Sequence, residues 1–412
     1  MYRLRLFLFA LLWLPLSAFA GDNWQFSGFG SLSMARLSDD NLTFLDYDNK
    51  KWRYEGDTVL GLQLTGNLMD RLSLTAQVVS RGYDEYDPDS FEPQLEWLFL
   101  AYQLDSQWRV RLGRMRTPHY MYSETIDVGY TYIWARPPID VYATIMSPFS
   151  HFDGADIQYL TTFNDTELDI RLFGGHINKT RPTGEIEIEP MIGTDLRLQK
   201  GNYGLHYSLM YDRINVYRDY GEAFTTALDQ IITFAPEFQA VKDGTFAKQN
   251  WYVYQALGLT WNGNRLSLNS EIFDIRNTDN GYTNDAHGGY LSAHTNLGSF
   301  TPYVVRGYFL NDFNPNALNV IENSLEQTPV GIPGLEAFDQ LRVLTRDHII
   351  RSNFGQRTWT LGVRYDAFSN VALKAEWQRF DFTAGNSGQF TRTNNEAPGH
   401  IRLVTFIIDV VF

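Results

Sequence analysis

The segment RLVTFIIDVVF (402–412), at the end of the chain, alternates two sets of side chains with a period of two. The interleaved residues include Asp409, the only charge after Arg402, whereas the other set is apolar throughout. That apolar set consists of Val404, Phe406, Ile408, Val410 and Phe412. The period predicts a β-strand with one continuous apolar face. Because the last residues of a soluble domain usually fray, we expect this strand to be held on both edges.

The first twenty residues have the three parts of a secretory signal. Arg3 and Arg5 form a basic start, an apolar core covers about 6–14, and 18–20 (Ala-Phe-Ala) supplies small residues for cleavage. The apolar run is too short for a spanning helix and ends at Pro15. We therefore predict a signal peptide over 1–20, export through the secretory pathway, and a single mature domain over 21–412.

The composition excludes several classes of protein. The 412 residues contain no cysteine, so disulfides and thiolate chemistry are absent. The net charge is −14, and it becomes −16 without the two arginines of the signal, which argues against nucleic acid as a partner. Aromatic residues reach 15% while mean hydropathy is −0.30. Past residue 20 every long apolar run is broken by charge, which excludes a helical membrane protein but not a β-barrel.

Alternating segments recur along the whole mature chain. The segment 72–81 sets Leu, Leu, Ala and Val against Ser, Thr, Gln, Val and Arg, and 203–212 sets Tyr and Leu against Gly, His, Ser, Met and Asp. Sixteen such segments are predicted to start near residues 24, 58, 72, 94, 108, 154, 167, 191, 202, 250, 265, 289, 301, 356, 371 and 400. The segments near 154, 167 and 191 are the weakest.

Short turns alternate with long loops between these segments. Turns such as 69–71, 105–107 and 262–264 have three residues. The long loops cover roughly 36–57, 81–92, 115–153, 175–190, 213–249, 276–288, 311–355 and 380–399. Turns at one end and long loops at the other form the hairpin plan of an outer-membrane barrel. The predicted fold class is therefore all-β: a transmembrane antiparallel β-barrel of sixteen strands.

A secreted β-sandwich also has alternating strands, and two features argue against it. Trp251 and Trp261 lie ten residues apart on one segment, which spans roughly 25 Å at ~3.3 Å per residue and ~40° tilt. That height matches an apolar band between two aromatic girdles. A sandwich would also leave the terminal strand as an unprotected edge, whereas in a barrel it pairs with the first strand near Trp24.

At this point the chain resembles a Gram-negative outer-membrane porin. The resemblance rests on the alternating segments, the signal, the terminal aromatic strand and RVRLGRMRTPHYMYSETIDVGYTYIWARPPIDVY (109–142), which is similar to the fifth strand and inward-folded third loop of the porin-like superfamily. It implies a water-filled channel for passive diffusion of small hydrophilic solutes and ions, a homotrimer, and location in the cell outer membrane. The alternating residues that end in Phe412 resemble the signal that barrel-assembly machinery reads.

One wall of a predicted constriction is basic. The candidate residues are Arg81, Arg109, Arg111, Arg114 and Arg116. Arg81, Arg109 and Arg111 take the lumenal parity, whereas Arg114 and Arg116 take the lipid parity if the strand continues. A charge facing lipid costs ~2–4 kcal/mol near the midplane, so we interpret Gly113 as a bulge or as the point where the chain turns inward. The alternative is that these arginines only solvate a wide lumen.

The opposite wall is predicted to be the 115–153 loop, which is too long for an idle connection. It carries Glu124, Asp127 and Asp140, with Arg136 as their possible partner. Acids facing arginines would create a field across the pore that favours polar solutes, and charged rings select ions.

The predicted lumen is nearly neutral, so the charge of the whole chain does not decide ion preference. By parity the lumenal bases are Arg81, Arg109, Arg111, Arg171, Arg197, Arg306, Arg364 and Lys374, and the lumenal acids are Glu96, Asp169, Asp195, Asp212, Glu271, Glu376 and Asp409. A single lysine argues against a phosphate-specific ladder. The excess of acidic residues falls in the loops. We expect the barrel to contact outer-membrane lipid and lipopolysaccharide, and the loop acids could hold divalent ions that bridge to the lipopolysaccharide.

An enzymatic barrel is the less favoured interpretation. The eight histidines are scattered, and neither G-x-S-x-G nor H-E-x-x-H occurs. His206 is interpreted as a lumen-lining polar residue. We predict no enzymatic activity, no cofactor and no metal. Two alternatives to general diffusion stay open: a substrate-selective channel with a binding site at the third loop, and a mainly structural or adhesive barrel that uses loops such as 311–355.

Overall fold

A computed structural model describes most of the mature chain. The described residues are 23–83, 90–142, 150–181, 184–218, 229–230, 232–233, 236, 239, 249–278, 285–312, 354–383, 386–392 and 398–412. The predicted signal over 1–20, most of the 311–355 loop and residues 143–149 of the predicted constriction loop lie outside these ranges. Among the described residues no helix has both the length and the apolarity needed to cross a membrane.

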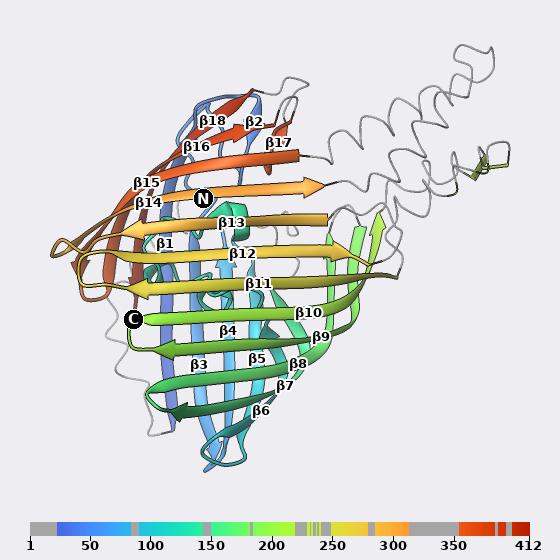
Figure 1. Ribbon diagram of the computed structural model, residues 1–412, viewed down its shortest axis with the longest axis vertical. Helices are drawn as coiled ribbons and strands as arrows, with labels where there is room; N and C mark the ends of the chain where they lie inside the picture. The colour runs from blue at the N-terminus through green and yellow to red at the C-terminus, as the bar shows by residue number, and fades with distance from the viewer. Residues whose placement is uncertain are drawn as a thin grey trace.

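Sixteen antiparallel strands form one closed barrel (Figure 1). They are β1 (Trp24–Leu37), β3 (Val59–Met69), β4 (Leu72–Arg81), β5 (Pro93–Gln103), β6 (Trp108–Arg116), β7 (His151–Phe163), β8 (Thr166–Arg181), β9 (Gly184–Lys200), β10 (Tyr203–Arg218), β11 (Asn250–Asn262), β12 (Ser267–Asn277), β13 (Asp285–His294), β14 (Phe300–Asp312), β15 (Phe354–Phe368), β16 (Val371–Phe382) and β18 (His400–Val411). Each strand pairs with its sequence neighbours, and β1 pairs with β18. The predicted fold class and strand number are confirmed.

The barrel closes where the first and last strands meet. Phe29 faces Val411 in the β1–β18 register, and Leu37 faces Leu403. Gly28 and Phe412 exchange two backbone hydrogen bonds of 2.8 and 3.0 Å. The terminal strand is thus held on both edges, by β1 and by β16.

All strands except β9 begin within four residues of the expected position. β9 begins at Gly184, seven residues before the predicted start. Its first residues reverse the pattern expected of a lipid-facing strand, because Ile186 and Ile188 are buried inside the barrel whereas Glu189 is exposed. Apolar residues pointing inward and acids pointing outward do not look like a lipid-facing strand, and the parity test therefore missed this part.

Side chains alternate between the lumen and the outer face, and this alternation corrects one prediction. In β14, Tyr303, Val305 and Phe309 are buried inside the barrel, which places Arg306 on the outer face between Val304 and Tyr308. The Arg306 guanidinium lies over the Trp359 ring of β15, 4.8 Å from its centroid. The prediction that Arg306 lines the lumen is wrong, because aromatic side chains occupy the inward positions of this strand.

Two further short strands close part of the loop end. β2 (Leu42–Thr43) and β17 (Thr391–Arg392) pair with each other above the barrel. The Phe44 and Phe390 rings pack against each other, tilted by 37°, beside Phe380 in an apolar cluster that also includes Ile139 of the connection between β6 and β7. These segments were expected to be open loops.

Candidate functional site

The connection between β6 and β7, which we call the inward loop (117–150), folds into the barrel. Its described part contains the 3-10 turns η2 (Ser123–Thr125) and η3 (Gly129–Thr131) and the helical turn α2 (Ile139–Tyr142). α2 packs against β12 to β15 on the wall opposite β6. The Pro137-Pro138 pair fits this path, because it disfavours a helix at Arg136 and α2 starts directly after it.

Buried carboxylates of the barrel wall hold the loop. Glu271 of β12 accepts hydrogen bonds from the backbone N–H of Met121 (2.7 Å) and from the Tyr142 hydroxyl. Glu376 of β16 accepts one from the backbone N–H of Ala135 (3.2 Å). Because an unpaired buried N–H costs about 1–3 kcal/mol, these acids stabilise the loop rather than charge the pore.

Basic wall residues bind the loop's carbonyl groups in the same way. Arg364 donates to the carbonyl oxygens of Tyr130 (2.7 Å) and Tyr132 (2.9 Å). Lys374 donates to the carbonyl oxygen of Gly129 (2.7 Å) and pairs with Asp409 at 2.9 Å. The lumen along β15, β16 and β18 is therefore filled by the loop.

Arg136 was expected to pair with the acids of the inward loop, but it pairs with other groups. Its guanidinium is buried and donates to Asp57, between β2 and β3, at 2.6 Å. It also donates to Gln378 (2.6 Å) and Thr405 (2.8 Å). Arg136 thus ties the inward loop to the first long loop and to the wall.

The loop acids Glu124 and Asp127 make direct ion pairs with wall arginines. Glu124 pairs with Arg171 of β8 at 2.6 Å, and Asp127 pairs with Arg81 of β4 at 2.8 Å and with Arg116. Burial by itself raises the pKa of Glu124, but Arg171, together with other arginines, lowers that pKa below its usual value. Arg81 and Arg116 likewise outweigh burial and lower the pKa of Asp127. Both acids therefore stay charged and compensated.

The Arg81 and Arg116 side chains meet at one more acid. Glu96 of β5 lies 2.7 Å from Arg81 and 3.4 Å from Arg116. Gln77 of β4 pairs with Trp97 and Val78 pairs with Leu95, so Glu96 is the extra residue of a bulge in β5, and its side chain turns inward while Leu95 stays exposed. Arg116 is buried and its guanidinium faces Asp127 of the inward loop.

Arg114 takes a different position. β6 remains paired with β7 through Arg116, and Gly113 has φ +133°, a conformation that favours glycine. Arg114 alternates with Leu112 on the outer face and pairs with Asp153 of β7 at 2.7 Å. Arg114 is therefore left out of the solute path proposed below.

The remaining arginines form a wall across β6, β8 and β9. Arg111 pairs with the buried Asp156 at 2.5 Å. Arg109 has an amide partner instead, because its Nε donates to Gln158 at 3.1 Å and Gln158 in turn donates to Asp169. On β9 and β10, Asp195 accepts from Arg197 at 3.1 Å and lies 2.5 Å from His206.

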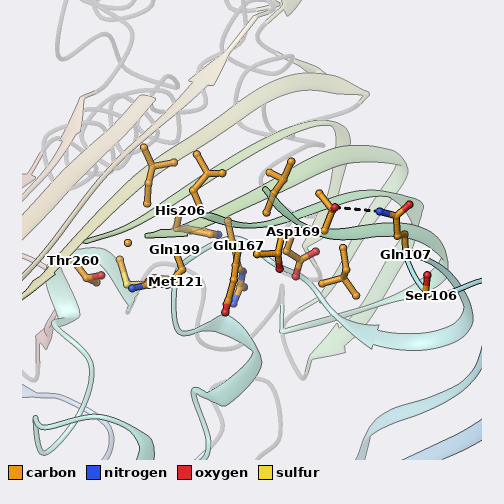
Figure 2. Close-up of a pocket in the computed structure, with 16 residues that line it drawn as sticks. Ser106, Gln107, Met121, Glu167, Asp169, Gln199, His206 and Thr260 are labelled. Carbon is orange, nitrogen blue, oxygen red and sulfur yellow. Dashed lines mark hydrogen bonds between the residues drawn. The ribbon is translucent and has the colours of Figure 1, made fainter. Parts of the chain in front are cut away.

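A cavity of about 800 Å³ lies beside this wall, toward the turn end (Figure 2). Met121 contributes from the inward loop. The polar lining comes mostly from β7 to β11 and includes Thr162, Glu167, Asp169, Arg197, His206 and Thr260. Open lumen thus remains on the side of the barrel that the loop leaves free.

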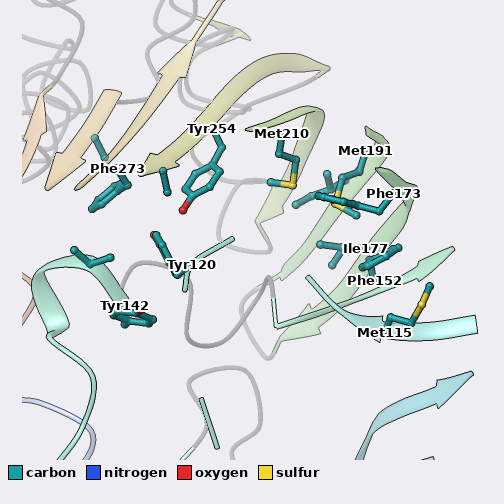
Figure 3. Packing of buried hydrophobic residues seen from close by; sticks show 14 of the residues in the cluster. Met115, Tyr120, Tyr142, Phe152, Phe173, Ile177, Met191, Met210, Tyr254 and Phe273 are labelled. Carbon is teal, nitrogen blue, oxygen red and sulfur yellow. The ribbon is translucent and has the colours of Figure 1, made fainter. Parts of the chain in front are cut away.

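Above the charged wall, toward the loop end, the same strands turn apolar side chains inward (Figure 3). This apolar layer consists of Met115, Phe152, Phe173, Met191 and Met210, all buried. These residues occupy the lumenal parity of their strands, so the sequence contained the signal for them. It was missed because only charged residues of that parity were considered.

Asp140 of α2 is a loop acid that forms no salt bridge among the described residues, although Arg306 lies within electrostatic range. Its carboxylate accepts hydrogen bonds from Thr358 (2.7 Å) and Gln356 (3.1 Å), and burial raises its pKa to about 6. Because the folded protein holds this proton more tightly than the unfolded chain, the stability that Asp140 contributes is fully present below the ordinary carboxyl pKa and is lost as the pH rises through about 6.

We predict that Asp140→Asn reduces this pH dependence. Between pH 4 and pH 7.5 the free energy of unfolding of the wild type should fall by up to about 2 kcal/mol more than that of the variant, since one pKa unit corresponds to ~1.4 kcal/mol. Denaturant midpoints of both proteins in one detergent, at both pH values, give the difference. Parallel pH profiles would contradict the assignment.

The architecture and the inward loop together define a barrel of the porin type, and the chain has the fold of the outer-membrane porins. The anion-selective porin from Comamonas acidovorans superposes with a TM-score of 0.56 at 12% identity, covering 94% of this chain and 99% of that chain. The outer membrane channel DcaP of Acinetobacter baumannii gives 0.55 at 11% identity, covering 94% and 97%. OprB of Pseudomonas putida gives 0.55 at 10% identity, covering 95% and 94%. No protein-family model and no curated protein matches the sequence.

Proposed function

We propose that the chain is an outer-membrane channel for passive diffusion of small hydrophilic solutes and ions. The observation that carries this proposal is the cavity of about 800 Å³ inside a closed barrel, which is lined by polar and apolar residues of β7 to β11, by the β5–β6 turn and by Met121 of the inward loop. The porin structures named above support it by fold. A signal peptide over 1–20, secretory export, insertion by barrel-assembly machinery and a homotrimer belong to the same proposal.

The solute path runs along the arginine wall rather than through the middle of the barrel. Arg197 lines the cavity, Arg171 pairs with Glu124 of the loop, and Arg109 lies within electrostatic range of the same Glu124. Most of these charges are compensated by acids, whereas Arg109 has an uncharged partner, Gln158. Arg109 is therefore the residue through which this wall acts on passing ions.

Single-channel conductance of the purified protein in a planar bilayer tests the proposal. Steady openings in multiples of three would support an open trimeric channel. Silence from demonstrably folded protein would contradict it and favour the structural or adhesive barrel. An assay for lipase activity on the same sample tests the prediction that the protein is not an enzyme.

We predict that Arg109→Ala shifts ion preference toward cations. The reversal potential in a tenfold KCl gradient should move by on the order of 10 mV, because an uncompensated charge at the path is lost. Arg114→Ala, on the outer face, is the matched control and should leave it unchanged. An unchanged value for Arg109→Ala would show that Arg109 does not line the narrowest point.

A substrate-selective channel is the second candidate, and the apolar layer favours it. A small solute with an anionic group and an apolar part would meet Arg197 of the cavity lining at one end and the apolar layer, including Phe173 and Met210, at the other. Block of conductance by linear carboxylates should then strengthen with chain length. A linear response to carboxylates and sugars alike would leave general diffusion.

A further inference from the structure

One buried acid on the lumenal face of the strands differs from the others. The others each have a basic or hydrogen-bonding partner within the chain: Glu96, Asp156, Asp195, Glu271, Glu376 and Asp409. Asp212 of β10 is 3% exposed, and its Oδ1 has no hydrogen-bond partner among the described residues. No charged side chain in the described part of the chain lies within electrostatic range of it. Because a buried carboxylate without a partner is costly, Asp212 is suited to bind a group from outside the chain.

The surroundings of Asp212 are apolar. On β10 it lies between Met210 and Ile214, which are two residues away on either side. Its cross-strand neighbours are Met191 of β9 and Tyr252 of β11. Met191 and Met210 belong to the apolar layer (Figure 3), and Ile214 packs against the same cluster. Asp212 is therefore a single acid set into the apolar layer of the lumen.

The cation nearest to Asp212 in the sequence, Arg213, points away from the lumen. The β9–β10 register shifts between Asp212 and Ile214, which marks a bulge. Arg213 lies in this bulge, where its Nε donates to the carbonyl oxygen of Glu189 at 2.9 Å. Its guanidinium lies 5.7 Å from the centroid of the Trp251 ring on the outer face. The described residues thus supply no cation to Asp212, and a cation carried by a solute takes that place.

The groups around Asp212 suit an organic cation better than a metal ion. Ca²⁺ and Mg²⁺ bind about six or more oxygen ligands, whereas the described ranges contain no group of three or more His, Cys, Asp or Glu side chains that could hold a metal ion. A protonated amine needs a single carboxylate for its charge. Its apolar part gains from the flexible thioether side chains of Met191 and Met210, which adapt to different shapes.

We propose that Asp212 binds the ammonium group of a small aliphatic amine whose apolar part packs on the apolar layer. Asp212 lies six residues beyond His206 along β10, which is ~20 Å at ~3.3 Å per residue. A solute that enters from the loop end therefore meets the amine site before the arginine wall. The inference rests on the proposed channel, because the amine reaches Asp212 through the lumen, and it adds a cationic class of solute to the anionic class considered above.

Isothermal titration calorimetry of the folded protein in detergent tests this site, with butylammonium chloride as the probe. Asp212→Asn keeps the size of the side chain and removes its charge, so it should bind butylammonium roughly tenfold more weakly than wild type. Glu167→Gln is the matched control, since it removes an acid of the cavity lining at the turn end, and it should bind butylammonium as wild type does. From ethyl- to butylammonium the affinity of wild type should rise roughly two- to fourfold for each methylene group, because each one buries apolar surface.

Heat-modifiable migration on gels checks that each variant is folded. If Asp212→Asn fails this check, Met210→Ala decides, because it keeps the acid and should weaken the binding of butylammonium more than that of ethylammonium. Equal butylammonium binding by wild type and folded Asp212→Asn overturns the proposal. Binding of CaCl₂ that depends on Asp212, without binding of the amine, also overturns it, because the site would then hold a metal ion.

Conductance in KCl is a separate readout on the same samples. Butylammonium binding that depends on Asp212, in protein that conducts no ions, would support the site and contradict only the proposed channel. Steady openings in protein that does not bind butylammonium would support the channel and overturn the amine site.

Discussion

Deletion of Phe412 should lower the amount of folded barrel roughly tenfold, because it opens the β1–β18 seam where unpaired backbone groups in lipid each cost several kcal/mol. Gly28 and Phe412 exchange two backbone hydrogen bonds of 2.8 and 3.0 Å there. The Phe412 ring also lies over Gly28, which has no side chain in its way. The fraction of heat-modifiable barrel after insertion into outer membranes measures the effect.

A substitution at Phe412 distinguishes the contribution of its ring from that of its backbone hydrogen bonds. Phe412→Ser keeps both backbone hydrogen bonds and should reduce folded barrel less than the deletion, but more than any loop substitution. Phe368→Ser is the matched control, since Phe368 is an exposed aromatic at the turn end, away from the seam. Wild-type amounts of folded barrel in both Phe412 variants would refute a role for this residue in closure.

The sequence predicts the barrel well because each strand of the wall can be recognised from its own few residues. Each segment shows a period of two and an apolar outer face, and it is joined to the next segment by a short turn or a long loop in alternation. The repetition of this pattern from one segment to the next strengthens the prediction for all of them. Glu96 shows how far the parity test reaches: it was assigned to the lumen, and a bulge in β5 places it there.

The same reasoning fails where contacts inside the lumen determine which side chains point inward. Arg306 was assigned to the lumen by the alternation of side chains along its predicted strand. In the fold, Tyr303 and Phe309 fill the inward positions against other lumenal groups, and Tyr303 donates to Glu376 at 2.8 Å. Which wall the inward loop contacts depends on side chains more than a hundred residues away, such as Glu271, and no local pattern encodes that pairing.

The acids assigned to the lumen also differ in role, which charge counting does not reveal. Glu271 and Glu376 hold loop N–H groups, Asp409 pairs with Lys374, and Asp169 borders the cavity. Two of these four therefore fix the loop, and they determine how much of the lumen stays open.

We expect Glu271→Ala to raise single-channel conductance roughly two- to threefold and to make it unsteady. The substitution removes the acceptor for the Met121 N–H, the Tyr142 hydroxyl and the Tyr290 hydroxyl (3.1 Å). Each buried donor left unpaired costs about 1–3 kcal/mol, so the loop segment between Met121 and Tyr142 loses its preference for this position. Conductance should then increase because the loop occupies lumen that the wall does not otherwise close.

Two controls separate loop release from loss of charge. Glu271→Gln keeps an oxygen acceptor for the loop and should conduct much as the wild type does. Glu167→Ala removes an acid of the cavity lining on β8. If Glu167→Ala raised conductance as much as Glu271→Ala, the effect would come from lumenal charge and the anchoring role of Glu271 would be wrong. A steady, wild-type conductance for Glu271→Ala would mean that Arg136, Arg364 and Lys374 hold the loop without Glu271.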